Sequence, residues 1–190
     1  MLEIIGFIIA LSSVWLVIKQ RRTGWLLSIL SGFIYIAIYG QAKLYSDAEL
    51  QLLYIAVATY GYHNWRKKKN AEVPVIHLAP ASSFILYITT VLLMTIVWGA
   101  LHSWMTDASW PYLDALLATT CIVAQWMMTH KYFQCWYLWI FANIGYIWMY
   151  AAKGLTTTTL LYVIFFVVTM NGYREWKRTL NLTLLDNNLT

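Results

Sequence analysis

The sequence is poor in charged residues. Asp, Glu, Lys and Arg make up 11% of its 190 residues, whereas soluble domains carry about a quarter. This scarcity excludes an ordinary soluble domain, and the 61% hydrophobic content excludes a disordered chain. Two cysteines, Cys121 and Cys135, are too few for a disulfide scaffold, and each falls in an apolar segment, where packing is the usual role. An integral membrane protein is the class that remains.

Recognisable catalytic motifs are also missing. The sequence contains no His-Glu-x-x-His, no Gly-x-Ser-x-Gly and no glycine-rich phosphate loop, so we expect no enzyme activity, no cofactor and no metal. His63 and His130 fall at helix ends on the same predicted side, which keeps a membrane haem protein or enzyme open as an alternative. A structural or receptor-type seven-helix protein is a third class.

Apolar segments of roughly the length of a membrane helix, about 20 residues, dominate the chain. They cover 2–18, 24–40, 48–65, 83–103, 110–129, 134–152 and 156–173. Each break between them carries charges or turn-forming residues, and the alternating ten-residue pattern of a membrane β-barrel is not seen. The sequence therefore predicts an all-α integral membrane protein with seven transmembrane helices.

The basic residues indicate how these helices are oriented. If the N-terminus lies outside, eleven of the thirteen Lys and Arg residues fall on the cytoplasmic side, leaving Lys43 and Lys153 outside. Cytoplasmic loops hold the excess of positive charge, so we predict the N-terminus out and the C-terminus in. This distribution makes the basic residues determinants of topology and argues against nucleic-acid binding. No basic n-region opens the chain, so we expect no cleavable signal peptide and a first helix that is retained.

An internal repeat connects the two ends of the chain. A shift of 111 positions aligns 25–65 with 136–176, and twelve of the 41 aligned pairs are identical, among them Trp25/Trp136, Tyr35/Tyr146, Gly61/Gly172 and Trp65/Trp176. The repeat pairs the first three helices with the last three and leaves 83–103 as a connector. The predicted architecture is therefore 3+1+3, with two parallel triple-helix repeats.

This plan divides the chain into a first repeat at 1–65, a cytoplasmic loop and connector helix at 66–105, a second repeat at 106–178 and a cytoplasmic tail at 179–190. Parallel repeats about an axis along the membrane normal occur in transporters, which bind their substrate between the halves. The repeat therefore favours a transporter over a receptor.

Candidate binding residues are those that differ between the two repeats. Trp136, Trp139 and Asn143 follow the pattern W-x-x-W-x-x-x-N, which places all three on one helix face, and the first repeat has Trp25, Ser28 and Gly32 at these positions. Indole faces attract a flat, positively charged ring, and an amide can bind its polar substituents. Packing or interfacial anchoring is the alternative for each Trp. Asn143, a polar residue deep in a predicted helix, needs a neighbouring helix or a ligand as its partner.

Further candidates extend this set. Tyr146 and Tyr150 continue the same line, Asn171 replaces the Tyr60 of the first repeat, and Trp25 and Tyr35 are first-repeat counterparts of Trp136 and Tyr146. Asp114, Glu49 and Gln51 lie near predicted outer helix ends, where either hydration or substrate binding explains them. Gln125 lies deeper and could reach a central cavity or bond a neighbouring helix.

The sequence resembles the Pnu vitamin transporters, the PnuC-like group. The resemblance rests on Trp136 to Asn143, on Ala42-Lys43-Leu44-Tyr45 and on Asn171 to Trp176, and it covers nearly the whole chain. It implies a bacterial inner-membrane facilitator related to SWEET sugar transporters, often a homotrimer in the lipid bilayer. It also implies uncoupled uptake of an unphosphorylated vitamin, with trapping by a cytoplasmic vitamin kinase.

The resemblance leaves several vitamins possible, namely thiamine, nicotinamide riboside and riboflavin. Members for nicotinamide riboside tend to be longer and to carry an Asn near the position where this chain has Ser31-Gly32. Losing a hydrogen-bonding amide weakens recognition of a polar ligand. We therefore expect thiamine, with nicotinamide riboside as the alternative.

Overall fold

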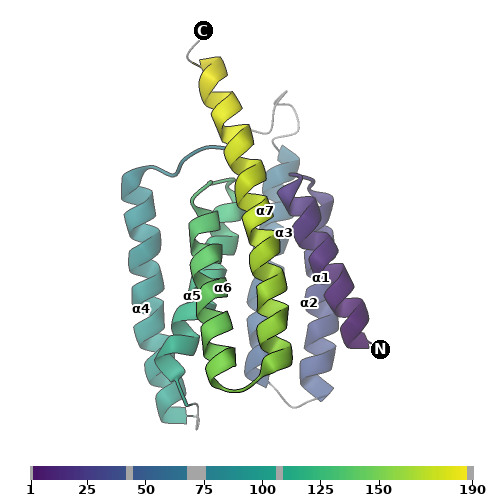
Figure 1. The fold of residues 1–190 in the computed structure, drawn as a ribbon, viewed down its shortest axis with the longest axis vertical. Coiled ribbons are helices and arrows are strands. Elements are labelled where there is room, and N and C mark those ends of the chain that lie inside the picture. Colours follow the sequence, from purple (N-terminus) through teal and green to yellow (C-terminus); the bar gives the residue numbers. More distant parts are fainter. Residues whose placement is uncertain (1, 42–44, 68–75, 106–108, 188–190) are drawn as a thin grey trace. The chain divides into compact units, whose positions relative to one another are not determined.

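The computed structural model describes residues 2–41, 45–67, 76–105 and 109–187, which form seven α-helices (Figure 1). These are α1 (Leu2–Ile18), α2 (Thr23–Gln41), α3 (Tyr45–Lys67), α4 (Ala81–Met105), α5 (Pro111–Thr129), α6 (Cys135–Ala152) and α7 (Thr156–Asn187). The seven predicted helices are confirmed. The first six begin and end close to their predicted bounds, whereas α7 continues beyond the expected end at Tyr173.

The length and composition of these helices suit a membrane. Thr23–Gln41, Ala81–Met105 and Thr156–Leu182 are long and apolar enough to cross one, and Leu2–Ile18 is a shorter apolar helix. That all seven helices cross, in a 3+1+3 arrangement with the N-terminus outside, stays a prediction. Lys43, Lys68 and Lys69, which contribute to the predicted orientation, lie outside the described residues.

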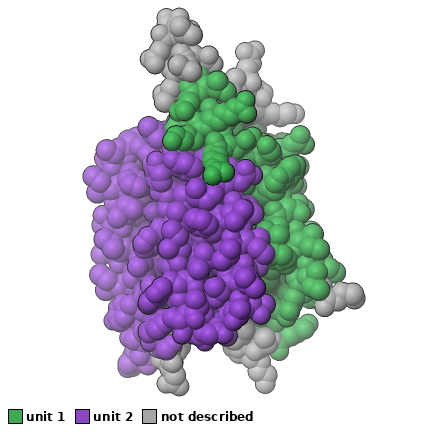
Figure 2. Space-filling view, in the orientation of Figure 1, with its two compact units in different colours: residues 1–76, 128–131, 174–190 green, residues 77–127, 132–173 purple. Residues whose placement is uncertain are grey.

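The chain divides into two compact units, coloured separately in Figure 2. Unit 1 comprises residues 1–76, 128–131 and 174–190, and unit 2 comprises residues 77–127 and 132–173. In unit 1, α2 packs against both α1 and α3. Unit 2 contains α4, α6 and most of α5 and α7. The predicted division at 65, 105 and 178 follows the repeat and stays a prediction.

Two helix ends have the same left-handed cap, and the left-handed residue of each belongs to unit 1. Gln20 and Lys131, which are 111 positions apart, have φ angles of 56° and 59°. After α1, the N–H of Arg21 donates to the carbonyl of Leu16 at 2.8 Å; after α5, the N–H of Tyr132 donates to that of Met127 at 3.2 Å. Glycine usually occupies such a position. The repeat is therefore visible in backbone conformation where the sequence itself differs.

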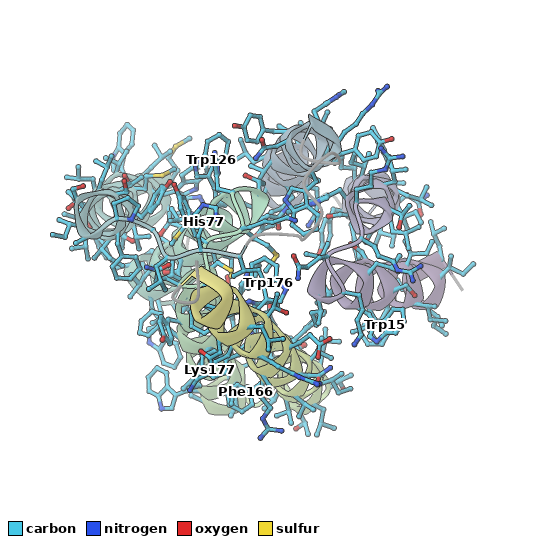
Figure 3. All side chains as sticks on the ribbon, turned by 90° about the horizontal axis from the view of Figure 1, so that it is seen from above. Trp15, His77, Trp126, Phe166, Trp176 and Lys177 are labelled. Atoms are coloured by element: carbon cyan, nitrogen blue, oxygen red, sulfur yellow. The ribbon has the colours of Figure 1, made fainter. Side chains whose placement is uncertain are left out.

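Two tryptophans of unit 1 bind these helix ends reciprocally. The indole N–H of Trp65, from the first repeat, donates to the carbonyl of Thr129 at 2.9 Å. The indole N–H of Trp176, from the second repeat, donates to the carbonyl of Ile18 at 3.0 Å. Residues 18 and 129 are again 111 positions apart. Trp176 is fully buried, whereas its neighbour Lys177 is exposed; both are labelled in Figure 3.

A second packing motif recurs once in each unit. In unit 1, a Cβ atom added to Gly61 would lie 2.8 Å from the ring of Trp25, and in unit 2 a Cβ added to Gly172 would lie closer still to the ring of Trp136. Both indoles are almost fully buried. The shared Trp and Gly identities therefore reflect the same close helix contact, made twice.

We expect the substitution Trp176→Phe to destabilise the protein more than Trp65→Phe. Each removes an indole donor and leaves a buried carbonyl without it, which costs about 1–3 kcal/mol. The carbonyl of Thr129 keeps a second donor, the side-chain amide of Asn64 at 2.9 Å, so Trp65→Phe should lower the stability less. Thermal unfolding in detergent measures the order, with Trp104→Phe as control because Trp104 is 86% exposed. Equal effects for all three variants would contradict the role of these bonds.

Candidate functional site

The centre of α6 in unit 2 carries a buried polar pair. Asn143 lies eight residues after Cys135, about 12 Å along the helix, and it is 4% exposed. Its amide nitrogen donates to the carbonyl of Trp139 at 2.8 Å and to the hydroxyl of Thr169 on α7 at 3.1 Å. Because a backbone carbonyl can only accept, the bond to Trp139 fixes which side of the amide carries nitrogen.

This pair leaves specific hydrogen-bonding groups unused. Both amide hydrogens of Asn143 are donated, so its carbonyl oxygen remains, and within the described residues no donor bonds to it. Thr169 accepts through its oxygen and keeps its hydroxyl hydrogen. The indole N–H of Trp139 is buried and has no hydrogen-bond partner in the described part of the chain. A buried N–H without a partner, such as that of Trp139, costs about 1–3 kcal/mol, and Trp25 in unit 1 carries the same cost. The unused groups of Asn143 and Thr169 are therefore what distinguishes this place from unit 1.

The corresponding place in unit 1 has no polar pair. Gly32 and Ala58 stand there in place of Asn143 and Thr169. A Cβ atom added to Gly32 would lie 2.6 Å from the side chain of Ile55, and Ala58 is fully buried. The first repeat is thus closed by apolar packing at the position where the second repeat has hydrogen-bonding capacity.

The other candidates on α6 have packing partners. Trp136 is 1% exposed and lies against Gly172, so its role matches that of Trp25 in unit 1. Tyr146 and Tyr150 stack on Tyr162 of α7, with ring centroids 4.5 and 5.3 Å away. The structure therefore brings Trp136, Trp139, Asn143, Tyr146 and Tyr150 together along one helix.

Four candidates belong to the first repeat and lie in unit 1. Trp25 is buried against Gly61 and meets Trp65 edge to face at 5.4 Å. Tyr35 stacks on Tyr39 at 5.8 Å, and Gln51 is partly exposed on α3. The side chain of Glu49 lies outside the described part of the chain.

The remaining candidates lie elsewhere in unit 2. Gln125 is partly exposed on α5. Asp114 is in the first turn of that helix, where the positive end of the helix dipole stabilises its negative charge. Asn171 is exposed on α7. It is two residues from Thr169, about 200° around the helix, so the structure does not bring it to Asn143.

The two histidines considered as haem ligands, His63 and His130, contact other side chains of unit 1. His130 contacts the hydroxyl of Thr129 at 3.0 Å through Nδ1 and the hydroxyl of Tyr60 at 3.3 Å through Nε2. His63 is exposed and meets Tyr62 edge to face. Both nitrogens of His130 are therefore occupied by hydroxyl groups.

Thr169 and Tyr162 are the members of this region that the sequence analysis missed. The signal was present, because they align with Ala58 and Gln51 in the same repeat comparison that singled out Asn143. Threonine is common in membrane helices, where its hydroxyl usually bonds the preceding turn, so its identity alone did not distinguish it.

Comparison with known proteins identifies the family. Residues 1–178 match the model of the family described as nicotinamide mononucleotide transporter. The nicotinamide riboside transporter PnuC of Escherichia coli K12 is 23% identical over 201 residues, covering 92% of this chain and 84% of that protein. The riboflavin/roseoflavin transporter RibM of Streptomyces davaonensis is 25% identical over 179 residues, covering 92% and 83%.

A solved structure agrees with the fold. The crystal structure of the vitamin B3 transporter PnuC superposes with a TM-score of 0.74 at 25% identity, covering 95% of this chain and 82% of that one. The family and these relatives are transporters rather than enzymes, and they agree with a multi-pass membrane protein. Seven helices, an apolar composition and a match along nearly the whole chain lead to one conclusion: this chain is a vitamin transporter that belongs to the nicotinamide mononucleotide transporter family.

Proposed function

We propose that this protein carries nicotinamide riboside across the bacterial inner membrane. The observation that carries the proposal is the polar group set on α6 and α7, formed by Trp139, Asn143 and Thr169. A pyridinium ring is flat and positively charged, which suits the indole of Trp139. Its carboxamide and ribose supply the hydrogen-bonding groups that a buried amide needs.

Nicotinamide riboside replaces thiamine as the favoured substrate. Relatives from Escherichia coli and Neisseria mucosa are described as nicotinamide riboside transporters, and RibM is described as a riboflavin/roseoflavin transporter. The expectation of thiamine rested on chain length and on Ser31-Gly32, which stands where an Asn was expected. Gly32 packs against Ile55 inside unit 1. Close packing therefore accounts for the absence of an amide there, and this absence is no longer an argument for thiamine.

The proposed transport is uncoupled, with a site that opens alternately to each side. Among the described side chains, the carboxylates are Glu3, Asp114 and Glu175. Glu3 and Asp114 occupy first turns of helices, and Glu175 pairs with Lys19 at 2.9 Å. A proton or sodium relay usually requires a carboxylate deep in the membrane, which none of these three provides.

Further parts of the proposal come from the family resemblance. They are assembly as a homotrimer and trapping of the transported vitamin by a cytoplasmic kinase that phosphorylates it. Trapping suits an uncoupled facilitator, because removal of the free vitamin keeps its inward gradient favourable.

We expect purified protein to bind nicotinamide riboside more tightly than thiamine or riboflavin, and Asn143→Ala to weaken that binding by about tenfold or more. The variant leaves a ligand group buried without its partner, which costs about 1–3 kcal/mol, and about 1.4 kcal/mol is tenfold in affinity. Isothermal titration calorimetry in detergent gives the affinities directly.

The matched control for this titration is Asn181→Ala, which changes an exposed asparagine on the extension of α7. It should bind as the unaltered protein does. Tighter binding of thiamine or riboflavin would move the substrate assignment, and unchanged binding by Asn143→Ala would remove Asn143 from the site.

A second prediction concerns coupling. Exchange of labelled nicotinamide riboside in proteoliposomes should be the same with and without a proton or sodium gradient, because the described carboxylates are not placed as relays. Abolishing the gradient with an ionophore provides the comparison. A loss of exchange would point to a coupling ion.

A further inference from the structure

The bonds between Asn143 and Thr169 determine what a ligand can meet. The second amide hydrogen of Asn143 is held by the Thr169 hydroxyl at 3.1 Å, and the first by the carbonyl of Trp139. The amide therefore presents an acceptor, its carbonyl oxygen. The Thr169 hydroxyl, whose oxygen is already engaged, presents a donor hydrogen. An acceptor and a donor thus lie side by side on two neighbouring helices.

An adjacent acceptor and donor match a group that carries a donor beside an acceptor. A primary carboxamide carries an N–H donor and a carbonyl acceptor on neighbouring atoms, so it can satisfy both side chains at once. A carboxylate carries acceptors alone, so one of its oxygens would face the carbonyl oxygen of Asn143. Asn143 and Thr169 are 4% and 6% exposed. A ligand group that cannot form a hydrogen bond at such a buried position lowers the binding free energy more than it would at an exposed one.

We infer that Thr169 is a specificity-determining residue: its hydroxyl occupies the second Asn143 N–H and offers its own hydrogen, so that the site accepts a flat ring with an amide-type edge and rejects the corresponding acid. The inference rests on the proposed function and deepens it. In nicotinamide riboside the carboxamide is attached to the ring, which suits a site in which the indole of Trp139 lies one helical turn before Asn143. The first repeat has Ala58 at the position of Thr169, so the pairing of an amide with a hydroxyl occurs in the second repeat alone.

The test compares nicotinamide riboside with nicotinic acid riboside, which differs by carboxamide against carboxylate. Calorimetry of the unaltered protein should show tighter binding of the amide. Thr169→Val removes the hydroxyl at nearly constant volume and frees an Asn143 N–H to donate to the acid, so the preference should fall about tenfold, the equivalent of one hydrogen bond. Thr169→Ala, which copies Ala58, gives the same test if the valine variant folds poorly.

Two control variants separate the effect of the Thr169 hydroxyl from a general loss of structure. Thr169→Ser keeps the hydroxyl and should keep the preference for the amide. Thr89→Val removes an exposed hydroxyl on α4 that donates to Ile85, and it should leave both affinities unchanged.

The outcomes distinguish the two claims. If the unaltered protein does not bind nicotinamide riboside, the proposed function fails and the inference fails with it. If it binds the amide and the acid equally, or if Thr169→Val and Thr169→Ala keep the full preference, the inference alone is overturned. Loss of preference in Thr169→Ser to the same degree as in Thr169→Val would also overturn it, because the hydroxyl is then not the determinant.

Discussion

Two carbonyl groups at helix ends, those of Ile18 and Thr129, set the constraint on which unit 1 depends. Each lies two residues before the left-handed residue that follows its helix, and each receives the indole N–H of a tryptophan from the opposite repeat. Lys131 adds to this arrangement, since its ammonium lies 4.8 Å from the ring of Trp65 and 3.5 Å from the side-chain oxygen of Gln20. A buried carbonyl needs a donor, so these bonds explain why both repeats end in tryptophan.

Positions that the two repeats share have a different role from positions at which they differ. Trp25 with Gly61, and Trp136 with Gly172, make the same close contact in their own units. In both pairs a side chain larger than that of glycine would clash with the indole. At the positions of Gly32 and Ala58 the second repeat has Asn143 and Thr169, so the proposed binding residues stand where the two repeats differ. Trp136 consequently packs in the same way as Trp25, whereas Trp139 belongs to the proposed site.

Much of this could be predicted from the sequence, because helix bounds and the repeat follow from hydropathy and spacing. The extension of α7 to Asn187 could not be predicted in this way, because hydropathy detects only the apolar part of a helix. The added residues form helix through the propensity of Lys, Arg and Leu and through burial of Trp176 and Leu180. Asn171 was singled out for its divergence without regard to helical phase, and the structure places it on the exposed face. The left-handed caps at Gln20 and Lys131 were also missed, because neither residue is the glycine that normally indicates one.

In the proposed mode of binding, the second repeat holds the ring and its amide edge through Trp139, Asn143 and Thr169. A structure of the protein with nicotinamide riboside bound tests it most directly. We expect the ring to lie against the indole of Trp139, with the carboxamide nitrogen within hydrogen-bonding distance of the Asn143 carbonyl oxygen. A ligand held by the first repeat near Gly32 and Ala58, or one that meets Asn143 through the ribose alone, would contradict it.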